Sequence, residues 1–228
     1  MAIQFFPNSA QFLALSYIRD LDSRKIQTII DGLANITPPL LRPSELRETL
    51  AALLPDDVDK INVIAPQLIS LYTLKRGRGL TTEQLVEGLR FAISSEHSKW
   101  SPEDIARWQE MEPRLRDLLS LGPVTTIVKA LDLSFDYYSL LQNSKIITDI
   151  RPVFNEAGSE IQGALVSFTL RLHLDSVSGS SSMSIALDQD DVIKLRKACE
   201  RALEKAKTAQ AFMRAGGIDK TLISGEEG

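Results

Sequence analysis

The sequence predicts an α+β protein: an all-helical N-terminal domain, then a small antiparallel three-stranded sheet and one C-terminal helix. Three observations predict this class. Apolar residues recur at helical spacing from Asn8 to about Asn143. Apolar and polar residues then alternate from Val166 to Leu174, as they do in a strand with one buried face. A final amphipathic stretch after Asp188 predicts a helix.

Seven helices are expected in the N-terminal domain, separated by proline, glycine and capping residues. Ser44 is predicted to cap the third helix, and Pro66 to kink or split the fourth. Ser101 and Pro102 predict a well-defined helix start. The expected apolar faces lie within Phe12–Ile18, Ile26–Leu33, Leu46–Leu54, Val58–Leu71, Leu85–Ile93, Ile105–Leu115 and Val124–Leu141.

The segment Lys75–Gly79 contains two glycines and three cations. This composition suits solvent better than a core, so the segment is predicted to be a loop at a solvated helix terminus. A phosphate-binding loop is disfavoured, because the segment lacks the Walker spacing and the terminal Lys-Ser or Lys-Thr pair.

Three strands are expected after Asn143. The run Lys145–Phe154 is rich in β-branched residues and contains Pro152, which belongs at an edge or a bulge because it cannot donate to a ladder. A turn at 155–159 leads to the alternating strand Val166–Leu174. A Gly/Ser loop at 178–182 precedes the third strand, Met183–Leu187. Short polar connections between strands favour an antiparallel meander.

Asp188 is a good N-cap for the last helix, which is predicted to lie on the sheet and to end at Gly216-Gly217. The predicted domains are therefore a helical domain, 1–143, a βββα domain, 144–215, and a disordered tail, 216–228. Three strands and one helix bury little apolar area for their length, so the sheet needs a cover: the helical domain or a second copy. The candidate dimer or partner interface consists of Ile150, Val166, Phe168, Leu170, Leu172, Met183, Ile185, Leu187, Val192, Leu195, Cys199 and Leu203.

The order of these elements resembles the COMM-domain (copper-metabolism-type) family over roughly residues 145–207. The shared features are the strand around Asp149-Ile150-Arg151, the alternating second strand and a short third strand that runs directly into the helix. The family usually has tryptophan where this chain has Ile150. The resemblance implies a scaffold subunit without enzymatic activity that dimerises through its C-terminal strands and helix, with itself or a related subunit, within a larger protein assembly.

Composition excludes several other classes. The chain has 228 residues and a net charge of -4, which argues against nucleic-acid binding. One cysteine and two histidines exclude a disulfide framework and a cysteine-rich zinc site, and no metal or cofactor is predicted. Neither a secretory signal nor the roughly 18 apolar residues of a spanning helix is visible, so a cytoplasmic protein is expected.

Some residues have side chains that suit metal binding or partner binding. His173, Met183 and Cys199 have soft-metal chemistry, but His173 is expected on the opposite strand face from Met183, and Cys199 is predicted to be a buried thiol. Asp188, Asp190 and Asp191 lack the spacing of a calcium loop and are better explained as helix capping. Trp100 and Trp108 could anchor a partner, although a core position is favoured.

Two other functions are less favoured by the sequence than the scaffold. The alternative is a small-molecule or lipid-binding module with an apolar pocket between helices and sheet. An enzyme is disfavoured, because no set of nucleophile, base and orienting residue is apparent from the motifs.

Overall fold

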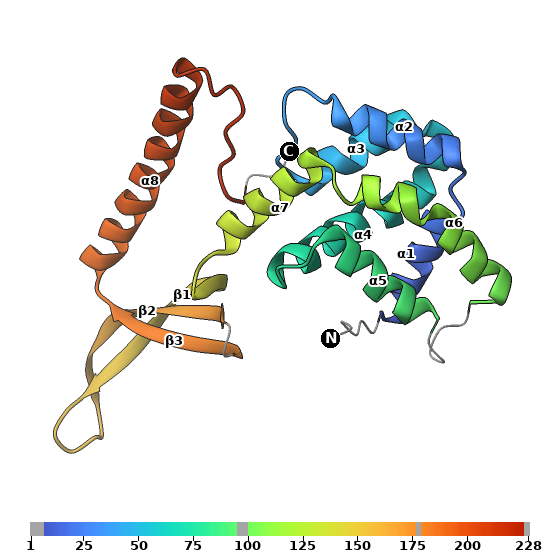
Figure 1. Ribbon diagram of the computed structural model, residues 1–228. Coiled ribbons are helices and arrows are strands. Elements are labelled where there is room, and N and C mark those ends of the chain that lie inside the picture. Colours follow the sequence, from blue (N-terminus) through green and yellow to red (C-terminus); the bar gives the residue numbers. More distant parts are fainter. Residues whose placement is uncertain (1–6, 95–99, 177–178, 226–228) are drawn as a thin grey trace. The chain divides into compact units, whose positions relative to one another are not determined.

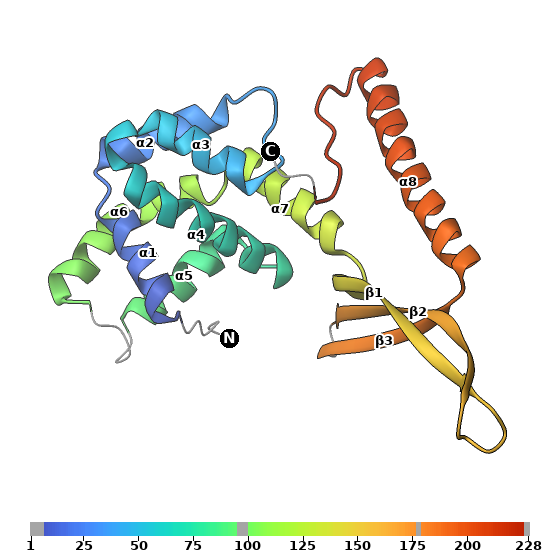
Figure 2. The same cartoon turned by 180° about the vertical axis from the view of Figure 1, so that it is seen from behind.

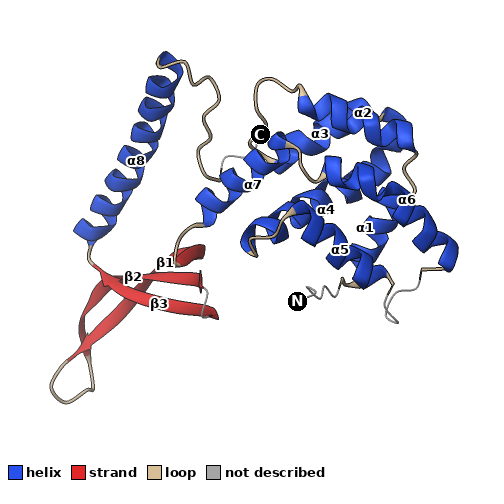
Figure 3. Ribbon diagram, in the orientation of Figure 1, coloured by secondary structure: helices blue, strands red, loops and turns tan. Residues whose placement is uncertain are grey.

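A computed structural model of the chain describes residues 7–94, 100–176 and 179–225 (Figure 1). These residues form two compact units, one up to residue 134 and one from residue 135 onward. The first unit is helical, and the second holds a three-stranded antiparallel sheet followed by a helix, as Figure 3 shows by colour. The predicted α+β class is confirmed.

The helical unit contains seven α-helices among its described residues, as expected. Capping boxes begin three of them, with Asn8, Thr81 and Ser101 as the N-caps. The elements are α1 (Ser9–Arg19), α2 (Ser23–Ala34), α3 (Pro43–Leu53), the short 3-10 helix η1 (Pro55–Asp57), α4 (Val58–Gly77), α5 (Thr82–Ile93), α6 (Pro102–Leu118) and α7 (Gly122–Phe135).

Three local predictions for this unit are wrong in whole or in part. Arg42, not Ser44, is the N-cap of α3, because Pro43 occupies the first turn. Of the two outcomes predicted for Pro66, the split does not occur: α4 continues through this residue, where buried neighbours on both sides hold it in place despite the missing donor. Residues 75–77 form the last turn of α4, so the predicted loop is confined to residues 78–80.

The core of the helical unit is extensive. It includes Leu15, Ile18, Ile29, Leu50, Leu68 and Trp108, all at most 1% exposed. The helices α2 and α3 approach each other closely at Gly32, where an added Cβ would lie 2.5 Å from Cδ1 of Leu53. Burial of Trp108 agrees with its predicted core position, and Trp100 packs edge-on against it at 5.5 Å between ring centres.

The second unit is a meander with strand order β1-β2-β3. Its elements are β1 (Ser139–Phe154), β2 (Ile161–Ser176), β3 (Gly179–Leu187) and α8 (Gln189–Ala215). The strand β1 begins earlier than predicted, and α7 ends at Phe135 rather than near Leu141. Residues 179–182, predicted to be a loop, belong to β3. The two long strands therefore extend well beyond the shorter β3 at the hairpin end.

The last helix ends in a turn that reverses the chain. Gly217 has a positive φ of 84°, and Ile218 N–H donates to the Met213 carbonyl oxygen at 3.0 Å, which is a Schellman arrangement. Gln210 Nε2 then donates to the Thr221 carbonyl oxygen at 3.3 Å, so the following residues return along α8. Of the predicted tail, residues 226–228 lie outside the described part of the chain.

Candidate functional site

One face of the sheet is apolar on all three strands. The ladders place Ile150 opposite Val166, and Leu170 between Ile146 and Ile185. Residues paired across a ladder share a face, so these positions form one surface. This surface, called the apolar sheet face below, comprises Ile146, Ile150, Val166, Phe168, Leu170, Leu172, Met183, Ile185 and Leu187. The structure thus brings together all eight strand residues of the predicted interface.

The apolar sheet face is open to solvent in the single chain. Ile150 is 72% exposed, Val166 53% and Met183 50%, and Phe168 and Leu170 are only half-buried. None of the described residues from 135 onward is fully buried. The second unit therefore has no closed core of its own, in contrast to the helical unit.

The helix α8 contacts the sheet only with its first turns. Figures 1 and 2 show the helix leaving the sheet near its N-terminus and extending away from it. A groove of about 490 Å³ remains between them, and its lining includes Leu170, Ile185, Leu187, Leu195 and Ala198. The prediction that this helix lies along the sheet is wrong for the single chain.

The helical members of the predicted interface differ in their surroundings. Val192 is half-buried near the sheet, and Leu195 lines the groove. Leu203, further along α8, is 63% exposed, and Cys199 is exposed as well. The prediction of a buried thiol is therefore wrong for the single chain, because none of the described elements covers this side of α8.

The residues with metal-binding chemistry are not brought together. Met183 pairs with Leu172 on the apolar sheet face, whereas His173 pairs with Asn143 and Ser182 on the opposite face. Among the described residues, no group of three or more His, Cys, Asp or Glu is placed to hold a metal ion. Asp188 caps α8 as predicted: it accepts from Asp191 N–H at 2.8 Å, and its own N–H donates to the Asp191 carboxylate at 3.2 Å.

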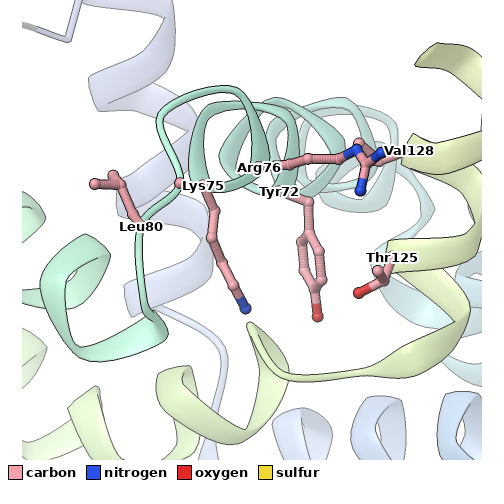
Figure 4. A pocket seen from close by; sticks show the side chains of 7 residues that line it. Tyr72, Lys75, Arg76, Leu80, Thr125 and Val128 are labelled. Atoms are coloured by element: carbon pink, nitrogen blue, oxygen red, sulfur yellow. The ribbon is translucent and has the colours of Figure 1, made fainter.

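The helical unit has a smaller pocket of about 220 Å³, lined by Tyr72, Lys75, Arg76, Gly79, Leu80, Thr125 and Val128 (Figure 4). The Tyr72 hydroxyl donates to the Leu118 carbonyl oxygen at 2.8 Å and accepts from Leu121 N–H at 2.7 Å. Lys75 Nζ donates to Thr82 Oγ1 and to the Leu119 carbonyl oxygen, both at 2.8 Å. These bonds fasten α4 to the α6–α7 connection and to the start of α5, so both side chains stabilise the packing of the helical unit.

Burial raises the pKa of Tyr72 well above its ordinary value and lowers the pKa of Lys75. Neither pKa shift was foreseeable from the sequence, because Lys75 belongs to a cationic segment whose composition predicts exposure to solvent. The tertiary contacts of α4, rather than its local composition, determine where this ammonium lies.

Two buried carboxylates also stabilise the helical unit. Asp57 is 6% exposed and accepts from Lys25 Nζ at 2.5 Å and Lys60 Nζ at 2.9 Å. These hydrogen bonds lower the pKa of Asp57. Glu112, 4% exposed, pairs with Arg90. Lys25 and Arg90 come from helices distant in sequence from the carboxylates they pair with and give no local sequence signal, whereas Lys60 is only three residues from Asp57.

Within the described residues, no single helix has the length and apolar character needed to cross a membrane. The pair α6 and α7 meets those two criteria jointly, with a bend of 66° between the helices.

No protein-family model matches the chain, and no curated protein matches it significantly.

Proposed function

We propose that the protein is a non-catalytic assembly module that dimerises through the apolar sheet face and the exposed side of α8. The observation that carries the proposal is the open apolar face of a unit without a closed core. Full burial of a large apolar side chain contributes about 1.5–3 kcal/mol, and the nine residues of the apolar sheet face are all of this kind. A second copy, or a related subunit, is the cover that satisfies them.

The exposed side of α8 supports the same proposal. Leu203 and Cys199 lie on a helix that leaves its own sheet after the first turns, so the apolar residues of α8 are free to contact a second chain. An order of three strands and one helix is also what the resemblance to the COMM-domain family leads one to expect. We therefore infer a COMM-like module, acting in the reducing cytoplasm, where an exposed thiol remains free.

The oligomeric state tests this proposal. Size-exclusion chromatography with light scattering on the full chain is expected to give about twice the monomer mass of 25.3 kDa at micromolar concentration. Dilution should convert the dimer to monomer. A monodisperse monomer that retains the ordered sheet at micromolar concentration would contradict the proposal.

A second candidate function is favoured by the groove between the sheet and α8. Its volume of about 490 Å³ lies within the range of small-molecule sites, and most of its lining is apolar. An apolar ligand or lipid chain could fill it instead of a partner. Native mass spectrometry separates the two: a monomer with an added compound of constant mass supports the ligand, and a ligand-free dimer supports assembly.

A further inference from the structure

The face of the sheet opposite the apolar sheet face carries an unusual pair of cations. Lys145 in β1 lies directly opposite Arg171 in β2, and Arg171 lies opposite Ser184 in β3. The adjacent row across the sheet contains Asn143, His173 and Ser182. All of these side chains are exposed. We call this set of six residues the cationic strip.

The two cations lack a counter-charge. Side chains in directly opposite positions have Cβ atoms about 4.5–5.5 Å apart, where like charges destabilise a sheet. Among the described residues, no carboxylate forms an ion pair with Lys145 or Arg171. Asp149 and Asp175 lie on the same face, but Asp149 is four residues from Lys145 and Asp175 is four residues from Arg171, which places each carboxylate roughly 13 Å along its strand from that cation. A bound anion would remove the repulsion.

We propose that the cationic strip binds a phosphorylated side chain of a partner protein. A phosphate monoester carries about -1.5 to -2 charges at pH 7, which balances two cations, whereas a carboxylate balances one. The guanidinium of Arg171 offers a planar fork of donors, and Lys145 adds a mobile point charge. Ser182, Ser184 and Asn143 supply neutral donors for the remaining oxygen atoms.

A protein segment fits this strip better than a membrane surface. Three strands span only about 10 Å across the sheet, which matches one phosphate group rather than a plane of headgroups. Asp149 and Asp175 flank the strip and would repel an extended anionic surface. The strip and the apolar sheet face lie on opposite sides, so phosphate binding is independent of the proposed dimerisation.

The test uses the full chain and a fluorescein-labelled glycine-alanine peptide with a central phosphoserine. Fluorescence anisotropy should show binding that weakens as salt is added. The same peptide with glutamate should bind more weakly, and the one with serine should not bind. Lys145→Gln and Arg171→Gln should each reduce affinity about tenfold, since each removes a charge-assisted contact.

Arg151→Gln provides the matched control, because Arg151 lies on the same face, opposite Leu165, away from the strip. This variant should retain native affinity. Circular dichroism should show all three variants folded, since neutralising one member of a like-charge pair relieves repulsion. No binding up to about 1 mM peptide, or equal loss in all three variants, would overturn the proposal. Binding to phosphatidylserine vesicles through Lys145 and Arg171, without binding the phosphopeptide, would also overturn it.

Discussion

Ile150 lies directly opposite Val166 in the β1–β2 ladder, and these side chains are 72% and 53% exposed. Cross-strand apolar pairs stabilise a sheet most when another layer excludes water from them. Here no described element of the second unit provides that layer over the pair. The position therefore offers a direct test of whether another chain does.

We expect Ile150→Asp to weaken the proposed dimer without unfolding the single chain. The side chain is mostly exposed in the monomer, so a carboxylate there costs the monomer little. In an assembled interface the same carboxylate would be buried without a partner, which costs several kcal/mol. Light scattering across a dilution series should show dissociation at a concentration at least about 100-fold higher than for the native chain.

Val153→Asp is the matched control for this experiment. Val153 is in the same strand and 51% exposed, but it pairs with Gly163 on the opposite face. The dimer of this variant should dissociate at the same concentration as the dimer of the native chain. Equal effects of the two substitutions would show that the apolar sheet face is not the interface.

We expect Asp57→Asn to lower the melting temperature of the helical unit at neutral pH. Asp57 loses charge-assisted hydrogen bonds from Lys25 and Lys60. Because folding lowers the pKa of Asp57, its contribution is complete above its ordinary pKa of 3.8 and is lost as pH falls through the lowered value. The native and variant chains should therefore differ by a constant amount from pH 7 to about 5 and converge in stronger acid.

Urea unfolding followed by tryptophan fluorescence can measure this difference, since both tryptophans lie in the helical unit. Asp56→Asn serves as the control, because Asp56 is exposed beside Asp57. A stability difference for Asp57→Asn that persists unchanged below pH 3 would show that the charge of Asp57 is not its source.

We expect Tyr72→Phe to lower the free energy of unfolding of the helical unit by about 1–3 kcal/mol. The substitution removes the acceptor of Leu121 N–H and the donor to the Leu118 carbonyl oxygen, and leaves both groups buried. Tyr138→Phe, at a side chain that is 76% exposed, should change this value by less than about 0.5 kcal/mol. Equal stability of the two variants would mean that water replaces the Tyr72 hydroxyl.

We expect Asp188→Ala to loosen the start of α8. The change removes the capping box with Asp191 and should cost about 1 kcal/mol of local stability. Hydrogen exchange measured by mass spectrometry should be roughly fivefold faster over the first turns of α8. Asp190→Ala changes a carboxylate in the same turn but outside the box, so a similar acceleration there would assign the effect to charge rather than capping.

Local signals predicted much of the fold. Ser101 with Pro102 identified the start of α6, and alternation identified β2, because capping and strand faces depend on near neighbours. The α7–β1 junction was not predicted, since the apolar residues around Leu140 and Leu141 suit either element. Pairing of Leu141 with Leu174, far along the chain, selects the strand.

The candidate site, like the fold, was predictable where near neighbours determine the structure and not where distant contacts do. Strand alternation grouped Phe168, Leu170 and Leu172 on one face, as the register has it. The amphipathic pattern of α8 indicated that one side needs a cover, but no such pattern specifies which surface supplies it. Likewise, Lys25 and Asp57 pair across separate helices, and only the tertiary fold brings them within 2.5 Å.

The uneven distribution of buried residues has a consequence for the life of the protein in a cell. The helical unit precedes the sheet in the chain and can complete its own core before the sheet is synthesised, whereas the open sheet displays Ile150, Val166 and Met183 to the surrounding water. Under the proposed assembly, newly made chains that have not met a partner are targets for chaperones and proteases. We expect the steady-state abundance of this protein to follow the supply of whatever subunit covers that sheet.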